Sequence, residues 1–439
     1  MGYLTLIAFA WLTVVAGART GGRGALWYGW MSALLLAPVR MVAPLGIFVL
    51  DARSIAGVIG VAQAATARPE PGAARWRPSA SDALIVALIG SMLVSQLLAG
   101  NFRPKTPIAY ATAWLVPYLA GRLFVRSAAD FPRALRAVAL VTLLLATLSI
   151  VESLTRVNLL LIMQGGLSDS GGDVRAGLRR ATGPLGNPIF LGMMLALLLP
   201  WASEASRQAR AGAGPRWWRL LPWLVGIALV GTVSRGPILA GLATLLGTVY
   251  LRHRRWRALL VCAGLAGAVL VVTAKDAVVG MLTDVAGEDA EQTVVIRGKE
   301  YAYSGSLHRL LLFEVYWDYL VESGLFGYSP PTDHGDDEPE DVGKFTSIDC
   351  HYLMYTMQYG YIGMGLFVLL LAGALADLGR AARGGGAGAG LAGPLAMALA
   401  AVSLNMFSVW FAPDYAPAWI FTAGVAASLR DLAGEPAVP

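Results

Sequence analysis

Charged residues are scarce in this sequence: Asp, Glu, Lys and Arg together make up 14% of its 439 residues. A soluble protein of this length carries more charge, so the scarcity argues against a soluble globular domain. Hydrophobic residues make up 56% of the chain, and the mean hydropathy is +0.60. Apolar runs of roughly 17–25 residues recur, which is the length a helix needs to cross a bilayer. We therefore predict an all-α polytopic membrane protein, whose helices satisfy their own backbone hydrogen bonds in lipid.

Cysteine is equally rare, with only Cys262 and Cys350 in the whole chain. The first lies in an apolar run and the second in a polar loop, so no disulfide framework is expected. Residues 1–17 lack the basic stretch that opens a cleaved signal peptide, and we interpret them as a first helix. No internal repeat is visible at any fixed period.

About twelve membrane spans are predicted from the need for roughly 20 apolar residues per helix. Residues 1–274 would hold nine of them, residues 275–350 a large loop, and residues 351–439 the last three with a cytoplasmic tail. The spans are expected at approximately residues 2–17, 25–50, 82–100, 107–125, 134–152, 183–203, 220–234, 236–252, 257–274, 351–377, 391–411 and 414–430.

Arginine-rich connections alternate along the chain, and this alternation sets the predicted orientation. They lie near residues 53–77, 126–136, 207–219, 252–257 and 380–383. The positive-inside rule makes that side cytoplasmic, so both termini are expected there. The 275–350 loop and the 153–182 connection are then external. Arg19 and Arg23 also fall outside, against the rule.

The external loop contains one segment that resembles an interfacial helix. Residues 306–322 are apolar over most of one side and include Tyr316, Trp317 and Tyr319, which is typical of a helix lying at the membrane surface. The acidic stretch Asp333–Asp341 follows and lacks the spacing of a calcium loop, so we expect solvated loop and no metal site. The excess of basic residues is assigned to helix ends, and no nucleic-acid partner is expected.

Arg235 is the sharpest candidate for anion binding. It follows Ser234 in a turn of a few residues between two apolar runs. Arginine keeps its charge and presents a planar fork that matches phosphate oxygens. A snorkelling arginine at a helix end would give the same pattern, so both interpretations stand on spacing alone.

A second basic group, Arg179 and Arg180, precedes a Gly- and Pro-containing loop that ends at Asn187. Backbone N–H groups in such a loop and the following helix N-terminus can hold an anion. An ordinary turn with basic flanks is the alternative. Both groups fall on the predicted external side.

His351 stands where the polar loop meets the next apolar run, with Asp349 two residues earlier. A carboxylate near an imidazole raises its basicity and can fix its tautomer, so His351 is the candidate base. A histidine that only begins a helix is the alternative. Glu152, at the end of an earlier span on the same side, could orient an arginine or serve as a second base.

Four short motifs follow one another along the chain: Arg180 with Gly183 and Asn187-Pro188, then Ser234-Arg235-Gly236, then Arg309 in the long loop, then Asp349-x-His351. In this order they resemble the O-antigen ligase/O-antigen polymerase superfamily of bacterial envelope glycosyltransferases. The resemblance covers roughly residues 130–410 and rests on the order and shared sidedness of short motifs.

The resemblance implies a metal-independent, inverting transferase without cofactor in the bacterial inner membrane. It would move a glycan from an undecaprenyl-diphosphate carrier to an acceptor hydroxyl at the periplasmic face. Arg180 and Arg235 would grip the diphosphate, Arg309 would support them, and His351 would act as base or orient the acceptor. Arg179, Asn187, Ser234, Asp349 and Glu152 are the further substrate-binding candidates.

One departure from the family pattern bears on the acceptor: Tyr352 follows the histidine, where Asn is common in the family. This favours an exopolysaccharide or O-antigen polymerase, with a chain-length regulator as a further partner, over a ligase acting on lipid A core. The alternative from another class is a transporter or flippase of a lipid-linked or anionic solute.

Overall fold

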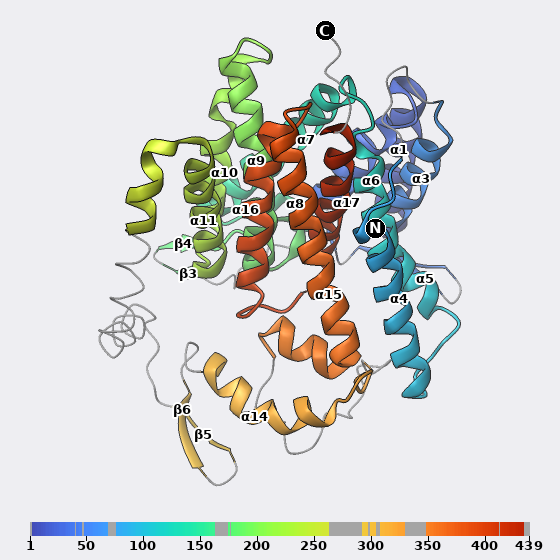
Figure 1. The fold of residues 1–439 in the computed structure, drawn as a ribbon, viewed down its shortest axis with the longest axis vertical. Helices are drawn as coiled ribbons and strands as arrows, with labels where there is room; N and C mark the ends of the chain where they lie inside the picture. Colours follow the sequence, from blue (N-terminus) through green and yellow to red (C-terminus); the bar gives the residue numbers. More distant parts are fainter. Residues whose placement is uncertain are drawn as a thin grey trace.

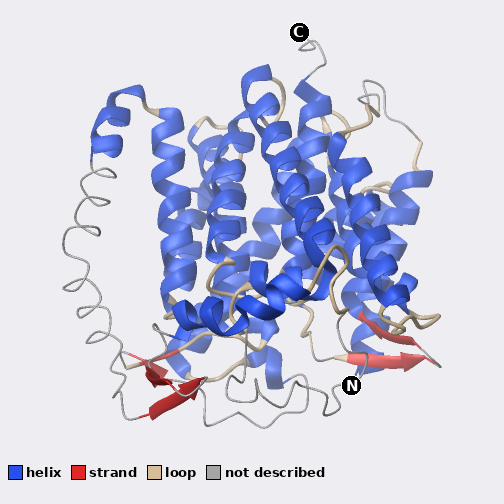
Figure 2. Cartoon of the chain, turned by 60° about the horizontal axis from the view of Figure 1, so that its bottom comes forward, coloured by secondary structure: helices blue, strands red, loops and turns tan. Residues whose placement is uncertain are grey.

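The computed structural model describes residues 2–39, 41–45, 48–68, 76–162, 174–175, 177–262, 292–296, 299–303, 308–329, 348–411 and 413–433. Within these ranges the chain forms a bundle of helices and three two-stranded antiparallel hairpins (Figure 1). The helices run side by side, and the hairpins lie at the end of the bundle away from the C-terminus (Figure 2).

The first half of the chain supplies α1 (Gly2–Thr20), the π-helix η1 (Ala25–Trp30), α2 (Met31–Leu36), β1 (Val42–Leu45), β2 (Phe48–Asp51), α3 (Ala52–Thr66), α4 (Ala80–Leu98), α5 (Thr106–Tyr110), the π-helix η2 (Ala111–Leu115), α6 (Val116–Phe124), α7 (Asp130–Thr155), α8 (Leu159–Ile162), β3 (Val174–Arg175), β4 (Leu178–Arg179) and the 3-10 turn η3 (Gly183–Leu185).

The second half supplies α9 (Pro188–Arg210), the 3-10 turn η4 (Arg216–Leu220), α10 (Leu221–Gly231), α11 (Arg235–Arg252), β5 (Gln292–Ile296), β6 (Lys299–Tyr303), α14 (His308–Glu322), α15 (His351–Gly384), α16 (Ala389–Asn405) and α17 (Ala416–Ala433). Helix α14 occupies the segment expected to be helical near residues 306–322; its place at a membrane surface stays a prediction.

Five helices among the described residues are long and apolar enough to cross a membrane: α1, α4, α7, α9 and α15. Helix α9 is the most enclosed, with 89% of its apolar window buried inside the protein. It therefore forms the centre of the bundle, against which α7, α10, α11 and α16 pack. The helical membrane architecture agrees with the sequence prediction, whereas the number twelve stays a prediction.

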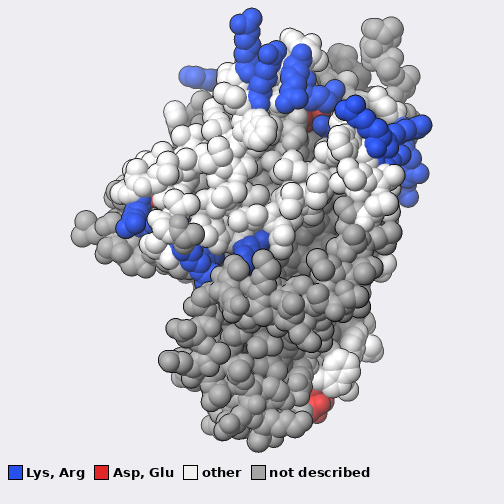
Figure 3. Space-filling model, turned by 90° about the vertical axis from the view of Figure 1, so that its left-hand side faces the viewer, with Lys and Arg blue, Asp and Glu red and all other residues white. Residues whose placement is uncertain are grey.

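Buried ion pairs gather at one end of the bundle, which we call the basic end. Arg122 binds Asp82 and Asp431 there, at 3.1 and 2.6 Å. Arg207 contacts Glu204, and the C-terminal turn of α15 lies at the same end. Figure 3 shows Lys and Arg side chains concentrated at this end of the visible face. These are the connections that the positive-inside rule assigns to the cytoplasm.

The single span predicted over residues 25–50 is wrong. Helix α2 ends at Leu36, and Ala37 is extended because the ring of Pro38 disfavours a helical conformation in the preceding residue. The chain then forms the β1–β2 hairpin and returns as α3. Two passes therefore replace one.

This extra pass changes the predicted position of the N-terminus. Arg23, expected outside, lies at the basic end, where its guanidinium binds Asp130 at 2.8 Å. The start of α1 lies against the hairpin instead, with Tyr3 donating to the Pro44 carbonyl at 2.6 Å. Ala433 packs on Gly384 at the basic end. The start of α1 and the end of α17 therefore lie at opposite ends of the bundle, which does not fit the expectation that both termini share one side (Figure 2).

The Arg23–Asp130 pair should matter for stability. One oxygen of Asp130 accepts from Arg23 and from the backbone N–H groups of Arg126 and Ser127, at 2.8, 3.0 and 2.9 Å. Asp130→Ala would leave Arg23 without its buried counter-charge, and we expect a loss of about 3–5 kcal/mol in free energy of unfolding. Thermal unfolding of the purified protein measures this, with the exposed Arg136→Ala as control; equal midpoints for the two variants would contradict the expectation.

Helix α15 is broken at Gly360, which has φ +70° and ψ −175° inside an otherwise helical segment. The break frees backbone groups that the segment 323–329, just after α14, takes up. The backbone N–H groups of Tyr361 and Ile362 donate to the carbonyls of residues 324 and 325, at 3.1 Å each. In the other direction, the N–H groups of residues 328 and 329 donate to the carbonyls of residues 357 and 358, at 2.8 Å each. The loop segment is thereby fastened to α15, as unpaired backbone polar groups in such a setting require.

Candidate active site

Glu152 organises the loop that begins the candidate site, at the end of the bundle opposite the basic end. It lies in the last turn of α7 and is 1% exposed. One carboxylate oxygen accepts from the backbone N–H and the hydroxyl of Thr182, at 3.0 and 2.8 Å, and the other from the Gly183 N–H at 2.9 Å. Asn158 adds a fourth donor at 3.0 Å. Glu152 thus shapes the 179–185 loop, and its oxygens are taken up by the protein itself.

Glu152→Gln tests this role, because a carboxamide replaces one acceptor oxygen by a donor facing the same N–H groups. We expect a loss of about 1–3 kcal/mol in free energy of unfolding. The exposed Glu322→Gln serves as matched control. A thermal midpoint unchanged in both variants would remove Glu152 from the structural support of the loop.

Arg179 and Arg180 point in different directions and take different partners. Arg179 is buried and donates to the Arg156 carbonyl at 2.6 Å, at the end of α7. Arg180 is partly exposed and reaches the turn before α11, where it donates to the hydroxyl of Ser234 at 2.8 Å and to the Thr232 carbonyl at 3.2 Å. The structure thus joins the two basic groups that the sequence predicts, through Arg180 and Ser234.

The turn that carries Arg235 is tightly held. Val233 has φ +46°, an uncommon conformation for a β-branched residue, with a cost of about 1–3 kcal/mol that the surroundings must sustain. Ser234 is buried and precedes α11, but its side chain does not cap the helix. Its hydroxyl oxygen instead accepts the hydrogen bond from Arg180. Arg235, the first residue of α11, is exposed. A tightly held turn therefore presents the exposed Arg235 directly after Ser234, the residue to which Arg180 donates.

Asn187 has a capping role. Its side-chain oxygen accepts from the N–H groups of Ile189 and Phe190, at 2.8 and 3.4 Å, and Pro188 occupies the first position of α9. An Asn cap followed by Pro is a standard helix start. The Asn187-Pro188 pair therefore fixes where α9 begins behind the 179–185 loop.

His351 begins α15 and lies in an aromatic cluster with 1% exposure. Its ring centroid is 4.8 to 5.1 Å from those of Tyr355, Phe367 and Phe411, and 5.7 Å from that of Tyr352. We name these five residues the His351 cluster. The histidine that the sequence predicts as the base, where the polar loop meets the next apolar run, is therefore enclosed by aromatic rings.

Two members of the His351 cluster carry buried polar atoms that lack a hydrogen-bond partner among the described residues: both ring nitrogens of His351 and the hydroxyl of Tyr355. Each unsatisfied buried group costs about 1–3 kcal/mol and calls for an explanation, such as a ligand or water that meets it. Tyr355 was not singled out from the sequence. Its spacing of four residues from His351, one helical turn, is the signal that could have identified it.

The end of α16 links His351 to the arginine turn. The His351 N–H donates to the Met406 carbonyl at 2.9 Å. On the neighbouring residue, the Asn405 side-chain oxygen lies so close to Gly236 that a Cβ there would approach it to 2.4 Å. His351 and Gly236, the residue after Arg235, therefore both lie against the segment Asn405-Met406.

The remaining candidates surround this arrangement. Asp349 precedes α15 and is partly buried, but it provides no hydrogen bond to either ring nitrogen of His351. Cys350 packs with Leu312 and Tyr316 of α14, and burial raises the pKa of its thiol because desolvation disfavours the thiolate. The Cys350 thiol is therefore expected to be unreactive. Arg309 belongs to α14, and its side chain lies outside the described part.

Among the described residues no group of three or more His, Cys, Asp or Glu side chains is placed to hold a metal ion. Asp333–Asp341 and Arg40 lie outside the described residues. The metal independence expected from the sequence stays a prediction.

A family model described as O-Antigen ligase matches residues 220–368. The matched segment contains α10, α11, α14 and the part of α15 that carries His351, whereas Glu152, Arg179, Arg180 and Asn187 precede it. The comparison with curated proteins gives no match.

Proposed function

Residues 220–368 place this chain in the O-antigen ligase/polymerase superfamily, and from that premise we propose that it transfers a glycan from undecaprenyl diphosphate to an acceptor hydroxyl. The reaction takes place at the end of the bundle opposite the basic end, on the periplasmic side of the bacterial inner membrane. The observation that carries the proposal is the hydrogen bond between Arg180 and Ser234, next to the exposed Arg235.

The two arginines fit the leaving group. When the bond between the anomeric carbon and the phosphate oxygen breaks, the diphosphate departs with the electron pair and gains negative charge. Guanidinium groups fixed before the reaction stabilise that charge without reorganising, which is the most effective form of electrostatic catalysis. Ser234 holds Arg180 in place, the 232–235 turn holds Arg235, and the Arg309 side chain is proposed as a further cation.

The acceptor hydroxyl attacks the anomeric carbon from the opposite face, so the configuration inverts. Its proton goes to His351, the proposed base. For this the acceptor must reach the His351 cluster. Phe407 is 52% exposed and its ring lies 4.3 Å from that of Tyr352, so an aromatic surface leads from the outside to the cluster. Sugar rings pack on such surfaces, and the unsatisfied atoms of His351 and Tyr355 can then meet acceptor hydroxyl groups.

We propose a second lipid-linked glycan as the acceptor, hence an exopolysaccharide or O-antigen polymerase. Tyr352 supports this choice, since it supplies an aromatic surface immediately after His351, where the family commonly has Asn. Ligation to lipid A core is the alternative within the same chemistry.

The test uses purified protein in lipid with undecaprenyl-diphosphate-linked glycan as donor. Released undecaprenyl diphosphate together with longer lipid-linked chains supports a polymerase. Release that requires lipid A core identifies a ligase. No release with either acceptor, combined with glycan-lipid movement across the vesicle membrane, would replace the proposal with a flippase. Activity in the presence of a chelator and inverted anomeric configuration in the product check the two mechanistic expectations.

Arg235→Lys separates charge from shape in the proposed diphosphate site. Lysine keeps the positive charge but loses the planar fork, so one charge-assisted hydrogen bond is lost. We expect kcat/KM to fall about 10-fold, with the thermal midpoint unchanged. Arg257→Lys is the matched control, because Arg257 lies beyond the far end of α11 and donates to the carbonyls of Tyr250 and Leu251. Full activity in Arg235→Lys would contradict bidentate binding.

A further inference from the structure

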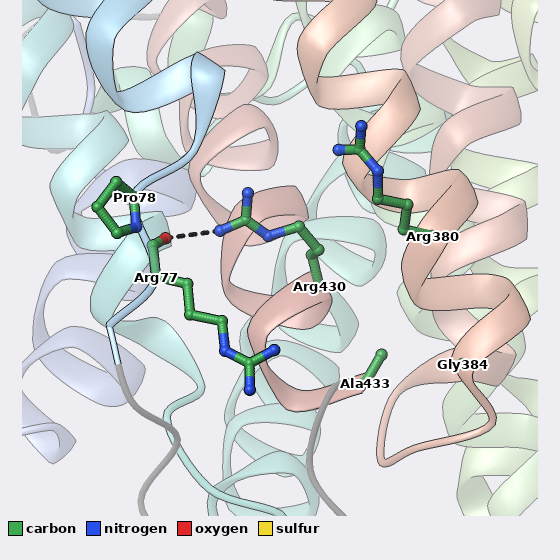
Figure 4. Close-up of a pocket in the computed structure, with 6 residues that line it drawn as sticks. All are labelled: Arg77, Pro78, Arg380, Gly384, Arg430 and Ala433. Carbon is green, nitrogen blue, oxygen red and sulfur yellow. Dashed lines mark hydrogen bonds between the residues drawn. The ribbon is translucent and has the colours of Figure 1, made fainter.

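A pocket of about 470 Å³ lies at the basic end, far from the candidate active site. Its volume falls in the range of small-molecule sites. Three segments distant in sequence meet around it: the stretch before α4, the end of α15 and the end of α17 (Figure 4). The residues that line it are Arg77, Pro78, Arg380, Gly384, Arg430 and Ala433.

The pocket is rigid because hydrogen bonds fix its backbone. The Arg77 carbonyl accepts from Arg430 at 2.6 Å and from Arg122 at 2.7 Å. Pro78 restricts the next residue, and Ser79 then begins α4 with a capping box. The Ser79 hydroxyl also donates to Asp377 of α15 at 2.7 Å. This hydrogen bond connects the start of α4 to α15 at the edge of the pocket.

Positive charge exceeds negative charge in this network. The described part of the chain contributes three carboxylates: Asp377 accepts from Arg380 and Arg430, Asp431 from Arg122 and Arg430, and Asp82 from Arg122. Arg126 lies 3.9 Å from Asp431. Among the described residues, the arginines of this network outnumber its aspartates: they are Arg77, Arg122, Arg126, Arg380 and Arg430 against Asp82, Asp377 and Asp431.

The arginines divide into a fixed and an available group. Arg122 is fully buried, and Arg430 donates to Asp377, Asp431 and the Arg77 carbonyl. These two arginines therefore hold the helix ends around the pocket together. Arg380 has one 2.9 Å contact to Asp377 while its side chain is 61% exposed, and Arg77 is exposed. Most N–H groups of these two guanidinium ions can therefore turn to a ligand in the pocket (Figure 4).

We propose that this pocket binds a phosphate group, as carried by an anionic lipid headgroup. Two guanidinium ions that line one pocket, with donors that the protein does not use, suit tetrahedral phosphate oxygens. The pocket lies at the helix ends that the charge distribution assigns to the cytoplasmic side, where anionic lipids attract basic residues and fill basic pockets between helices. The lipid would clamp the ends of α15 and α17 together. This inference does not depend on the proposed transfer activity.

The experiment compares Arg77→Gln/Arg380→Gln with Arg383→Gln in the full chain. Arg383 is an exposed arginine one turn beyond Arg380, donates to the Gly379 carbonyl at 2.9 Å and does not line the pocket. Protein in neutral detergent is titrated with short-chain phosphatidylglycerol, with phosphatidylcholine of the same chain length, and with inorganic phosphate alone, and binding is measured from the thermal midpoint and by native mass spectrometry.

We expect phosphatidylglycerol to bind the wild type and Arg383→Gln equally, and to bind the double variant about 10-fold more weakly or worse. Inorganic phosphate acting as strongly as the lipid would also support the site and would name the free anion as its ligand. Arg77→Lys/Arg380→Lys should retain part of the affinity. Equal lipid binding by the double variant and Arg383→Gln, or equal binding of phosphatidylcholine, would overturn the proposal. Unliganded midpoints within about 2 °C of one another exclude misfolding as the cause.

Discussion

Replacing His351 with phenylalanine is expected to reduce the rate of glycan transfer by a factor of about 10²–10⁴, while the protein remains folded. The imidazole is packed among aromatic rings and makes no side-chain hydrogen bond within the described residues. A phenyl ring of similar size therefore preserves the packing of the His351 cluster and removes only the two nitrogens. Stability should hold, because no hydrogen-bond partner is left unsatisfied by the change.

This substitution separates two roles that alanine cannot separate. His351→Ala would leave a cavity among the rings and reduce stability as well as activity. Transfer is measured as undecaprenyl diphosphate released per enzyme, and folding as the thermal midpoint. A fully active His351→Phe would show that the histidine is only a packing residue and would remove it from the mechanism.

Tyr355→Phe is the companion variant for the His351 cluster. It removes one unsatisfied hydroxyl and leaves the ring in place. If that hydroxyl orients the acceptor, KM should rise while kcat changes less. If it has no such role, the thermal midpoint should rise with transfer unchanged, because an unsatisfied buried polar atom has been removed.

The sequence alone predicted that several residues of the candidate site lie at the same end of the bundle. Alternating arginine-rich connections placed residues 180, 235 and 351 on one side, and the structure agrees. It did not predict what each side chain binds. Glu152 and Asn187 look like substrate ligands in a one-dimensional pattern, and only the folded loop shows that their oxygens accept backbone N–H groups.

The misplaced N-terminus has a similar cause. Hydropathy treats residues 25–50 as one apolar run, because neither a two-stranded hairpin nor a helix ending before Pro38 lowers the average. Local stereochemistry at the proline decides the fold there. The long-range pair of Arg23 with Asp130, 107 positions apart, could not be derived from either sequence neighbourhood.

The break in α15 is the third feature that the sequence conceals, and its removal gives the second large effect. Gly360→Ala is expected to lower the free energy of unfolding by about 3 kcal/mol or more. Its φ of +70° with ψ −175° belongs to a region that is essentially restricted to glycine. A Cβ at this position would also approach the Leu325 carbonyl oxygen to 2.2 Å. That contact is with backbone, so no flexible side chain can relieve it.

The consequence should extend from α15 to the candidate site. Four backbone hydrogen bonds join the segment 323–329 to the break, and α14, which packs on Cys350 and Leu353 beside His351, precedes that segment. Displacing the segment therefore moves the wall next to the proposed base, and transfer should fall together with stability. Gly365→Ala, in the same helix with open space around its Cβ, is the control and should be neutral or slightly stabilising. Equal thermal midpoints and transfer rates for the two variants would mean that the break can close without loss, and that the loop is not held by it.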